Sequence, residues 1–260
     1  MRANRSNPAS SGQDGGHFLR SIRLDTVPQD GYPFDLPVVR YLRTAGGLDL
    51  GPGMNFLIGE NGSGKSTLIE AIAVAAGLNA EGGSRSFRMA TRPSHSVLGE
   101  HLVLRRAPGR ERTSFFLRAE SFYNVASEIE RLDQGGPGLL AAYGGRSPHE
   151  RSHGESFLDL MRNRLGARGF YVMDEPEAAL SPRGCLVALR LWHELVRAGC
   201  QFLVATHSPL LLALPGAAII EIGADGSCRR VRYDETDVVR LTREFLDAPD
   251  RTLRHLLADG

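Results

Sequence analysis

The sequence predicts an α/β protein with a mainly parallel central sheet that is flanked by helices. Three short, mostly apolar runs, at residues 54–58, 169–173 and 201–205, have the length and composition of buried strands, and polar residues follow each of them. The first run leads through a glycine-rich loop into a helix-forming segment at residues 66–76, which Gly77 ends. In open α/β sheets ligands bind at the carboxyl ends of the strands, so the polar residues there are the candidates for function.

The glycine-rich loop contains a complete GxxxxGK[ST] motif. It spans residues 59–67 and includes Lys65, the only lysine in a chain with 31 basic residues. Between a strand and a helix, this motif is typical of loops that bind nucleotide phosphates. The residues expected to contact the nucleotide are Gly59, Asn61, Gly62, Ser63, Gly64, Lys65, Ser66 and Thr67.

The parts of this loop have separate physical roles. The backbone N–H groups of residues 62–66 can surround phosphate oxygens at a helix N-terminus, where the helix dipole favours anions. Lys65 is expected to reach the β- and γ-phosphates as a point charge, and the Ser66 hydroxyl to bind Mg²⁺. The alternative interpretation is a glycine-rich turn before a helix, without a ligand.

The second candidate group is a pair of carboxylates, Asp174 and Glu175, at the end of the predicted strand 169–173. Asp174 is expected to hold Mg²⁺ through a water molecule, and Glu175 to polarise an attacking water. An ordinary strand that ends in a solvated Asp-Glu-Pro turn would have the same sequence. The phosphate loop some 110 residues earlier favours the functional interpretation.

The third group, Thr206 and His207, follows the predicted strand 201–205. His207 could hydrogen-bond the γ-phosphate or the attacking water and so sense whether that phosphate is present. A single histidine after a strand is more often structural, and Ser208-Pro209 has the pattern of a helix N-cap followed by proline at the first helical position. The position after a third strand of the same kind favours a functional histidine.

The fourth group, residues 152–156, opens a helical run that ends near residue 165. Ser-x-x-Glu before apolar residues is a capping box, with Ser152 as N-cap. A serine hydroxyl, the backbone of Gly154 and the positive end of a helix dipole can also bind a γ-phosphate. The two interpretations are compatible.

The order of these motifs, with Ala179–Pro182 between the second and third groups, resembles the ABC ATPase set of Walker A, signature, Walker B, D-loop and H-loop. The resemblance covers roughly residues 50–215 and implies ATP and Mg²⁺ as cofactors. Its Ser-His-Gly-Glu-Ser signature departs from the Leu-Ser-Gly-Gly-Gln of transporters. The chain resembles more closely the soluble ATPases grouped near RecF and SMC heads. Unlike SMC heads, it has no heptad pattern for a coiled-coil arm between the Walker A motif and the signature. In those families two heads pair head to tail, which implies that Ser152 and Gly154 act on the nucleotide of a second copy.

Two further family features have only approximate counterparts. No glutamine follows a strand as the Q-loop of the family requires, and Glu120, after the predicted strand 113–117, stands nearest to that place. Tyr41 has roughly the spacing of the adenine-stacking aromatic of transporters, although it could equally be a core residue.

The resemblance implies an ATP hydrolase in which ATP binding drives dimerisation, and which acts on nucleic acid or on a partner protein. The alternative is the nucleotide-binding subunit of an ABC transporter with separate membrane subunits. It is weaker, because the transporter signature and the Q-loop glutamine are missing. A small-molecule kinase is a third option, which the pattern of Ser152, Glu175 and His207 disfavours.

The remaining sequence predicts a disordered leader at residues 1–16 and one ATPase domain at residues 17–260, with a variable insert at 80–150. The arginines of this insert could meet phosphates or a partner, or form a solvated face. A net charge of +1 gives no whole-molecule case for nucleic acid, and no apolar run could span a membrane. Three cysteines without CxxC spacing fit a cytoplasmic protein.

Short strands at residues 18–24, 38–42 and 48–50 predict an N-terminal antiparallel β-subdomain. Nearer the C-terminus we expect a helix that begins after Ser181-Pro182 and contains Trp192 as a core residue. A hairpin and two helices follow, at residues 219–233, 237–245 and 251–258.

Overall fold

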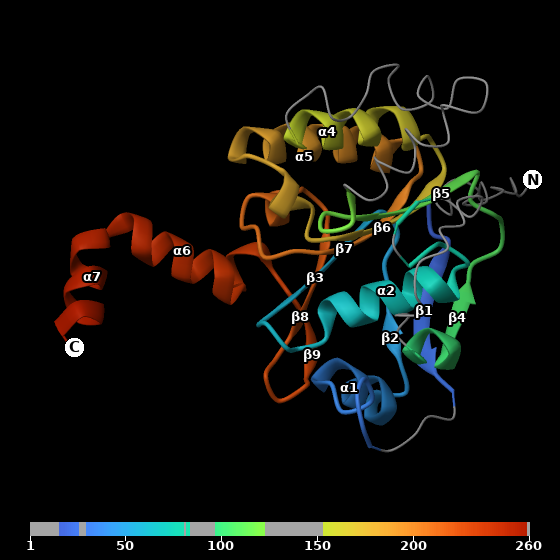
Figure 1. The fold of residues 1–260 in the computed structure, drawn as a ribbon, viewed down its shortest axis with the longest axis horizontal. Coiled ribbons are helices and arrows are strands. Elements are labelled where there is room, and N and C mark those ends of the chain that lie inside the picture. The colour runs from blue at the N-terminus through green and yellow to red at the C-terminus, as the bar shows by residue number, and fades with distance from the viewer. Residues whose placement is uncertain (1–15, 26–29, 81, 84–96, 123–152, 259–260) are drawn as a thin grey trace, which may run out of the picture.

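The computed structural model describes residues 16–25, 30–80, 82–83, 97–122 and 153–258, which form two sheets covered by helices (Figure 1). The larger sheet has six strands in the order β5-β6-β7-β3-β8-β9. In that order the strands are Thr113–Arg118, Gly169–Asp174, Gln201–Ala205, Met54–Gly59, Ala218–Ile222 and Cys228–Val231. The first five are mutually parallel and β9 is antiparallel, which confirms the predicted, mainly parallel sheet.

Helices cover both faces of this sheet because alternate strand residues point to opposite sides. On one face α4 (His153–Arg164) and α5 (Pro182–Arg197) bury Phe157 and Trp192 against Phe56 and Phe202. Trp192 is fully buried, which confirms its predicted place in the core. On the other face lie α1 (Pro37–Ala45), α2 (Lys65–Ala75) and the 3₁₀ helix η1 (Val97–His101), and Leu57, the neighbour of Phe56, points to that side.

The smaller sheet confirms the predicted N-terminal antiparallel subdomain. Its order is β2-β1-β4, with β2 at Leu48–Asp49, β1 at Leu19–Leu24 and β4 at Leu102–Arg106. The fully buried side chain of Gln201 joins it to the central sheet. This amide accepts hydrogen bonds from Phe18 N and Leu19 N and donates to Leu19 O and Gly51 O, each at 2.8 Å.

Two local expectations were wrong. Residues 38–42 are not a strand but part of α1, which begins at Pro37 and ends before Gly46, a residue with a φ of 74°. Val38, Val39 and Leu42 are buried on one side of that helix, so packing against the core overrides the strand propensity of two adjacent valines. After Ser208-Pro209 the chain forms only the short 3₁₀ helix η5, Leu211–Ala213.

The C-terminal elements agree with the sequence. Ser181 Oγ accepts a hydrogen bond from Gly184 N at 3.1 Å and so caps α5. Strands β8 and β9 form the predicted hairpin, and α6 (Asp237–Asp247) and α7 (Pro249–Ala258) follow, projecting from the body (Figure 1). No helix in the part of the chain that the structure describes is long and apolar enough to cross a membrane.

Some predictions lie outside the described residues. They concern the leader apart from Gly16, most of the insert at 80–150, and Ser152. The division into a leader and one domain therefore remains a prediction.

Candidate nucleotide-binding site

The loop between β3 and α2 has a backbone that glycine alone adopts easily. Gly59, Gly62 and Gly64 all have positive φ, and Gly64 is the residue directly before α2. A Cβ atom on Gly64 would lie 2.8 Å from Val38 Cγ1, and one on Gly59 would lie 2.5 Å from Ile222 O. Gly59 and Gly64 are therefore required both by conformation and by close packing, and Gly62 by conformation alone, as in a phosphate loop.

Lys65 lies at the first position of α2 with its side chain folded back over this loop. Nζ donates hydrogen bonds to Gly59 O and Glu60 O, each at 2.8 Å, and the residue is buried. Burial lowers the pKa of Lys65, while the carboxylates of Glu175, Asp174 and other nearby acids oppose that shift. The ammonium group is thus placed between the loop and the acidic end of β6.

Asp174 ends β6 in a site that leaves part of its carboxylate unsatisfied. The side chain is buried, and Oδ1 has no hydrogen-bond partner among the described residues. Burial raises the pKa of Asp174 to about 6, and the Arg118 guanidinium and a hydrogen bond with Ser66 oppose the shift. Ser66 and Asp174, the two predicted metal ligands, are therefore in contact.

This pair fits a magnesium ion that takes its other ligands from elsewhere. The described residues contain no group of three or more histidine, cysteine or acidic side chains that could hold a metal by themselves. Mg²⁺ is usually bound by one or two protein oxygens together with phosphates and water. The unpaired Oδ1 of Asp174 beside the Ser66 hydroxyl is such a partial set.

Replacing Asp174 with asparagine is expected to stabilise the protein at pH 8 when nucleotide and metal are absent. The folded pKa of about 6 lies above the ordinary 3.8, so the ionised carboxylate destabilises the fold above pH 6. The cost is about 2 to 3 kcal/mol, or several degrees in melting temperature, and it fades between pH 6 and pH 4. Thermal melts in EDTA at pH 8 and pH 4.5 test this. An equal change at both pH values would contradict it.

Glu175 and His207 approach each other across neighbouring strands. Glu175 Oε1 lies 3.7 Å from His207 Nε2, and both side chains are 38% exposed. The Glu175 backbone has a φ of 47°, and its N–H donates to Ala205 O at 3.0 Å, which holds the residue close to β7. A non-glycine residue with positive φ is strained, and such strain is frequent at functional sites.

His207 can act as a neutral hydrogen-bonding group. Burial lowers its pKa, and the charge of Lys65 lowers it further, although Glu175 and Glu177 oppose the shift. Nε2 has no hydrogen-bond partner among the described residues. A neutral imidazole beside Glu175 and Lys65 is available to a phosphate or a water at this edge.

The sequence analysis missed Glu177, which fixes the loop that holds His207. Glu177 Oε1 accepts hydrogen bonds from Thr206 Oγ1 at 2.8 Å and from the backbone N–H of His207. Glu177 lies in η4 (Pro176–Ala179), directly after β6. The second acid of the Glu-Pro-Glu run was the available signal, but its partner is 30 residues away in the sequence.

Replacing Glu177 with alanine is expected to lower kcat about a hundredfold while changing the affinity for ATP only a few-fold. The loop that carries His207 would lose its two side-chain hydrogen bonds, and small displacements of positioned groups cost about that much. Steady-state ATPase assays separate kcat from KM. Glu177→Gln is the matched control, because it keeps an acceptor oxygen and should retain most of the activity. Equal losses in both variants would contradict the positioning role.

Arg118 is a second missed residue, placed here by the pairing of parallel strands. It ends β5 opposite Asp174, and its Nε lies 3.4 Å from Asp174 Oδ2. Its Nη1 donates to Glu70 Oε2 at 3.0 Å. Glu120, the proposed Q-loop counterpart, lies 3.8 Å from the same guanidinium and is thus at this edge of the sheet.

Two aromatic residues, Tyr32 and the predicted Tyr41, differ in their surroundings. Tyr41 lies in α1 and packs against the hydrophobic core. Tyr32 is 76% exposed, and its hydroxyl lies 3.4 Å from Thr67 Oγ1 in α2. Tyr32 is therefore the better candidate for contact with a nucleobase.

Gly154 lies in the first turn of α4 and faces the segment after β6. A Cβ atom at this position would be 3.2 Å from Ala179 O, the last residue of η4. The predicted signature and D-loop are thus in contact within one chain. The action of Ser152 and Gly154 on the nucleotide of a second copy remains a prediction.

Comparison with known proteins places these motifs in a wider group. Residues 40–124 match a family described as an AAA domain. An ABC transporter ATP-binding protein of Methanothermobacter marburgensis is 30% identical over 110 residues, 39% of this chain and only 38% of that protein. The cytochrome c biogenesis ATP-binding export protein of Rhodopseudomonas palustris is 29% identical over 225 residues, 80% of this chain and 97% of that protein.

Two solved structures are also similar over most of the chain. The SMC head domain from Thermotoga maritima has 16% identity and a TM-score of 0.41, covering 82% of this chain and 98% of its own. An inward-facing metal-chelate type ABC transporter has 15% identity and a TM-score of 0.45, with 84% of each chain covered.

The ordered motifs and the site geometry agree with these comparisons. The chain is similar to ATP-binding proteins of the ABC class, and part of it matches an AAA domain.

Proposed function

We propose that the protein binds ATP with Mg²⁺ and hydrolyses it, and that ATP binding closes two copies head to tail. The observation that carries this proposal is the meeting of four side chains at one edge of three neighbouring strands. Lys65 begins α2 after the loop that follows β3, Asp174 ends β6 with Glu175 directly after it, and His207 follows β7. The negative charges of Glu175 and Asp174 both raise the pKa of Lys65, against the lowering by burial.

Each of these residues has a distinct role in the proposed reaction. Lys65 and the N–H groups of the loop bind the phosphates, and Ser66 and Asp174 hold the metal ion. When bound, Mg²⁺ supplies positive charge that offsets the charge of the phosphate oxygens. Glu175 orients and polarises the attacking water, and His207 hydrogen-bonds the γ-phosphate or that water.

The dimer part of the proposal rests on the signature segment. A nucleotide that contacts both copies stabilises their association by mass action, so ATP would act as a switch between separate and paired states. We propose that this switch acts on nucleic acid or on a partner protein. The names of the two ATP-binding relatives favour a second candidate, the nucleotide-binding subunit of a transporter.

The experiment that tests the proposal is Mg²⁺-dependent ATP hydrolysis by the purified protein at several concentrations. We expect specific activity to rise with protein concentration until the copies are fully associated, because each active site needs a second copy. Activity that does not depend on concentration, from a protein that stays monomeric with ATP, would refute the head-to-tail dimer. Stimulation by DNA or RNA would identify a nucleic-acid target. Stimulation only by a separately expressed membrane subunit would support the transporter candidate.

A further inference from the structure

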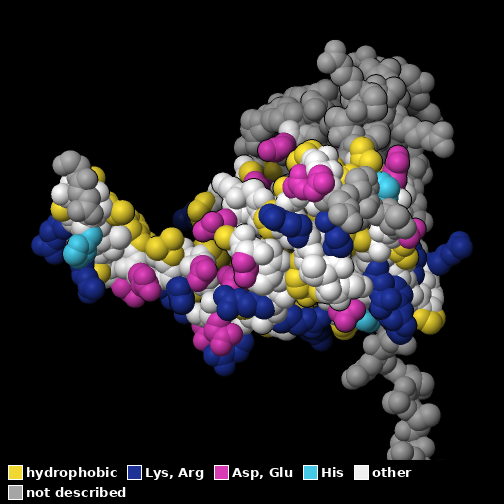
Figure 2. Space-filling model, turned by 90° about the horizontal axis from the view of Figure 1, so that it is seen from below, with side chains coloured by type: hydrophobic (Ala, Val, Ile, Leu, Met, Phe, Trp, Pro, Cys, Tyr) yellow, Lys and Arg dark blue, Asp and Glu magenta, His cyan; other side chains and the backbone are white. Residues whose placement is uncertain are grey.

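Helices α6 and α7 form an arm that projects from the body of the molecule (Figure 1). Ala248 alone connects the two helices. Six large apolar residues of the arm are between 39% and 76% exposed: Leu241, Phe245, Leu246, Leu253, Leu256 and Leu257. They gather along one side of the arm, while charged side chains occupy the other (Figure 2). So many exposed apolar residues in 21 positions indicate an interaction surface.

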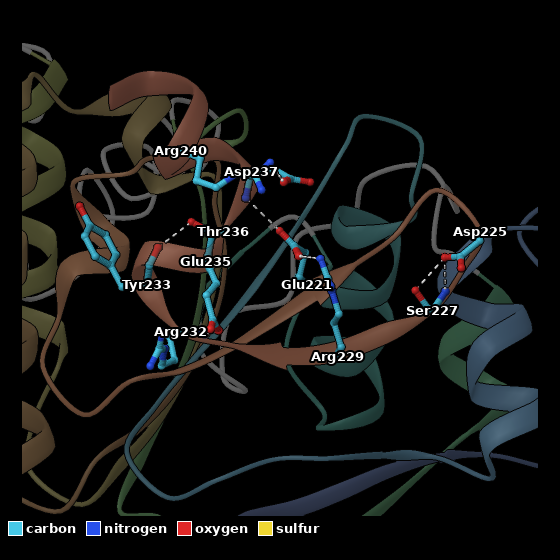
Figure 3. A network of polar contacts seen from close by, with 10 residues as sticks. All are labelled: Glu221, Asp225, Ser227, Arg229, Arg232, Tyr233, Glu235, Thr236, Asp237 and Arg240. Atoms are coloured by element: carbon cyan, nitrogen blue, oxygen red, sulfur yellow. Dashed lines mark hydrogen bonds and ion pairs between the residues drawn. The ribbon is translucent and has the colours of Figure 1, made fainter. Parts of the chain in front are cut away.

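The base of the arm is joined to the body by hydrogen bonds and by one buried side chain. Asp237 N, at the start of α6, donates to Glu221 Oε1, and Glu221 also pairs with Arg229 at 2.8 Å (Figure 3). Thr236 Oγ1 donates to Tyr233 O at 2.9 Å, and Val239 is buried in the core.

The residues of the arm are complementary about Pro249, the first residue of α7. Apolar residues stand at equal distances on either side of it, Phe245 with Leu253 and Leu241 with Leu257. Oppositely charged residues also lie at equal distances from Pro249: Asp247 corresponds to Arg251, and Glu244 to Arg254. In an antiparallel pair of helices, residues at equal distances from a common centre face each other. An α6 helix against an α7 helix would therefore match apolar with apolar and acid with base.

A single chain cannot make this pairing. Antiparallel helices in one chain need a connection of about 2 to 5 residues, and Ala248 is the only residue between α6 and α7. The high exposure of Leu241 and Leu257, 67% and 76%, agrees with helices that do not fold back on each other.

We propose that a second copy of this chain occupies the apolar side of the arm, with α6 of each copy antiparallel to α7 of the other. Such a contact is two-fold symmetric, so every matched pair occurs twice. The charges also favour a copy of the arm over nucleic acid or an anionic membrane. Four acidic and four arginine residues balance in the arm: Asp237, Glu244, Asp247 and Asp250, with Arg240, Arg243, Arg251 and Arg254.

The charges used in the proposed contact are available for it. Arg240 pairs with Asp237 at 2.8 Å, and Arg243 lies over the ring of Tyr233. In the structure as described, no ion pair is formed by the four residues of the matched charge pairs, Glu244, Asp247, Arg251 and Arg254.

This contact does not need nucleotide, so it differs from the ATP-dependent pairing proposed above. It would keep two copies at high effective concentration while ATP is exchanged. Its failure and the failure of the ATP-driven pairing can be told apart, because the arm is tested without nucleotide and in a Lys65→Ala background.

The test is the mass of the full chain by light scattering in EDTA without nucleotide. We expect a dimer in the wild type and in Lys65→Ala, and a monomer when Leu241→Glu and Leu257→Glu are combined. Leu186→Glu is the matched control, an exposed leucine on α5 that should leave the dimer intact. A monomeric wild type up to about 100 µM, or a dimer that survives the double substitution, would overturn the proposal.

Charge-reversal variants test the register in which α6 of one copy pairs with α7 of the other. Glu244→Arg alone and Arg254→Glu alone should each weaken the dimer about tenfold, and the two together should restore it. A Phe245→Cys chain mixed with a Leu253→Cys chain should form a disulfide between copies under mild oxidation, whereas either chain alone should not. Failure of the double reversal to restore the dimer, or cross-linking of the Phe245→Cys chain alone, would exclude this arrangement.

Discussion

Replacing Lys65 with alanine is expected to weaken ATP binding at least a hundredfold and to abolish hydrolysis. The loss follows from removing the buried ammonium that lies 2.8 Å from two loop carbonyls, next to Asp174 and Glu175. Charge-assisted hydrogen bonds contribute about 1.5 to 3 kcal/mol each, so loss of two phosphate contacts gives this magnitude. Binding of a fluorescent ATP analogue with Mg²⁺ measures the effect.

A second substitution of Lys65, with arginine, distinguishes a specific contact to phosphate from the effect of positive charge alone. Lys65→Arg keeps the charge, but a planar guanidinium differs in shape and size from the compact ammonium that donates to both Gly59 O and Glu60 O, so we expect it to be nearly as defective. The folding of both variants is checked by thermal melting without nucleotide. Unchanged affinity in a folded Lys65→Ala protein would refute the assignment of the phosphate loop.

Replacing Glu175 with glutamine is expected to stop turnover without loss of ATP binding. The carboxylate that we propose to polarise the water is removed, while Lys65, Ser66 and Asp174 still bind Mg²⁺ and ATP. Loss of a general base lowers kcat by about 10² to 10⁴. ATP should then remain bound and hold two copies together, which light scattering with and without ATP detects.

A surface acid provides the control for this substitution. Glu194→Gln removes an exposed acid of α5 that pairs with Arg190, and it should leave turnover unchanged. ATP-dependent association of the Glu175→Gln protein must be measured in a chain that also carries Leu241→Glu and Leu257→Glu. These two substitutions remove the proposed contact between arms, so that only association caused by ATP is detected. A Glu175→Gln protein that binds ATP and stays monomeric in that background would exclude the head-to-tail pairing.

The sequence was sufficient to predict the elements that carry the site. Each of the strands β3, β6 and β7 is a mostly apolar, buried run, because both faces of the sheet are covered, and each ends where the functional residues begin. The positions of Lys65, Asp174 and His207 at one edge follow from this order and from parallel pairing.

Other parts depend on contacts between distant residues and could not be predicted in this way. Arg118 reaches Asp174 only because β5 and β6 pair in a particular register, and Glu177 meets His207 only because β6 and β7 are neighbours. The helix at residues 37–45 has two adjacent valines, whose local preference is for a strand, and burial against the core decides its form.

The single lysine of the chain has a consequence for chemical modification. Within this sequence, Lys65 is the only lysine that amine-directed reagents and enzymes that acylate lysine could modify. An acyl group on Lys65 Nζ would remove the charge from the phosphate loop and break its contacts with Gly59 and Glu60. Modification of one side chain would therefore inactivate the whole molecule, and protection by bound nucleotide would report the occupancy of the site directly.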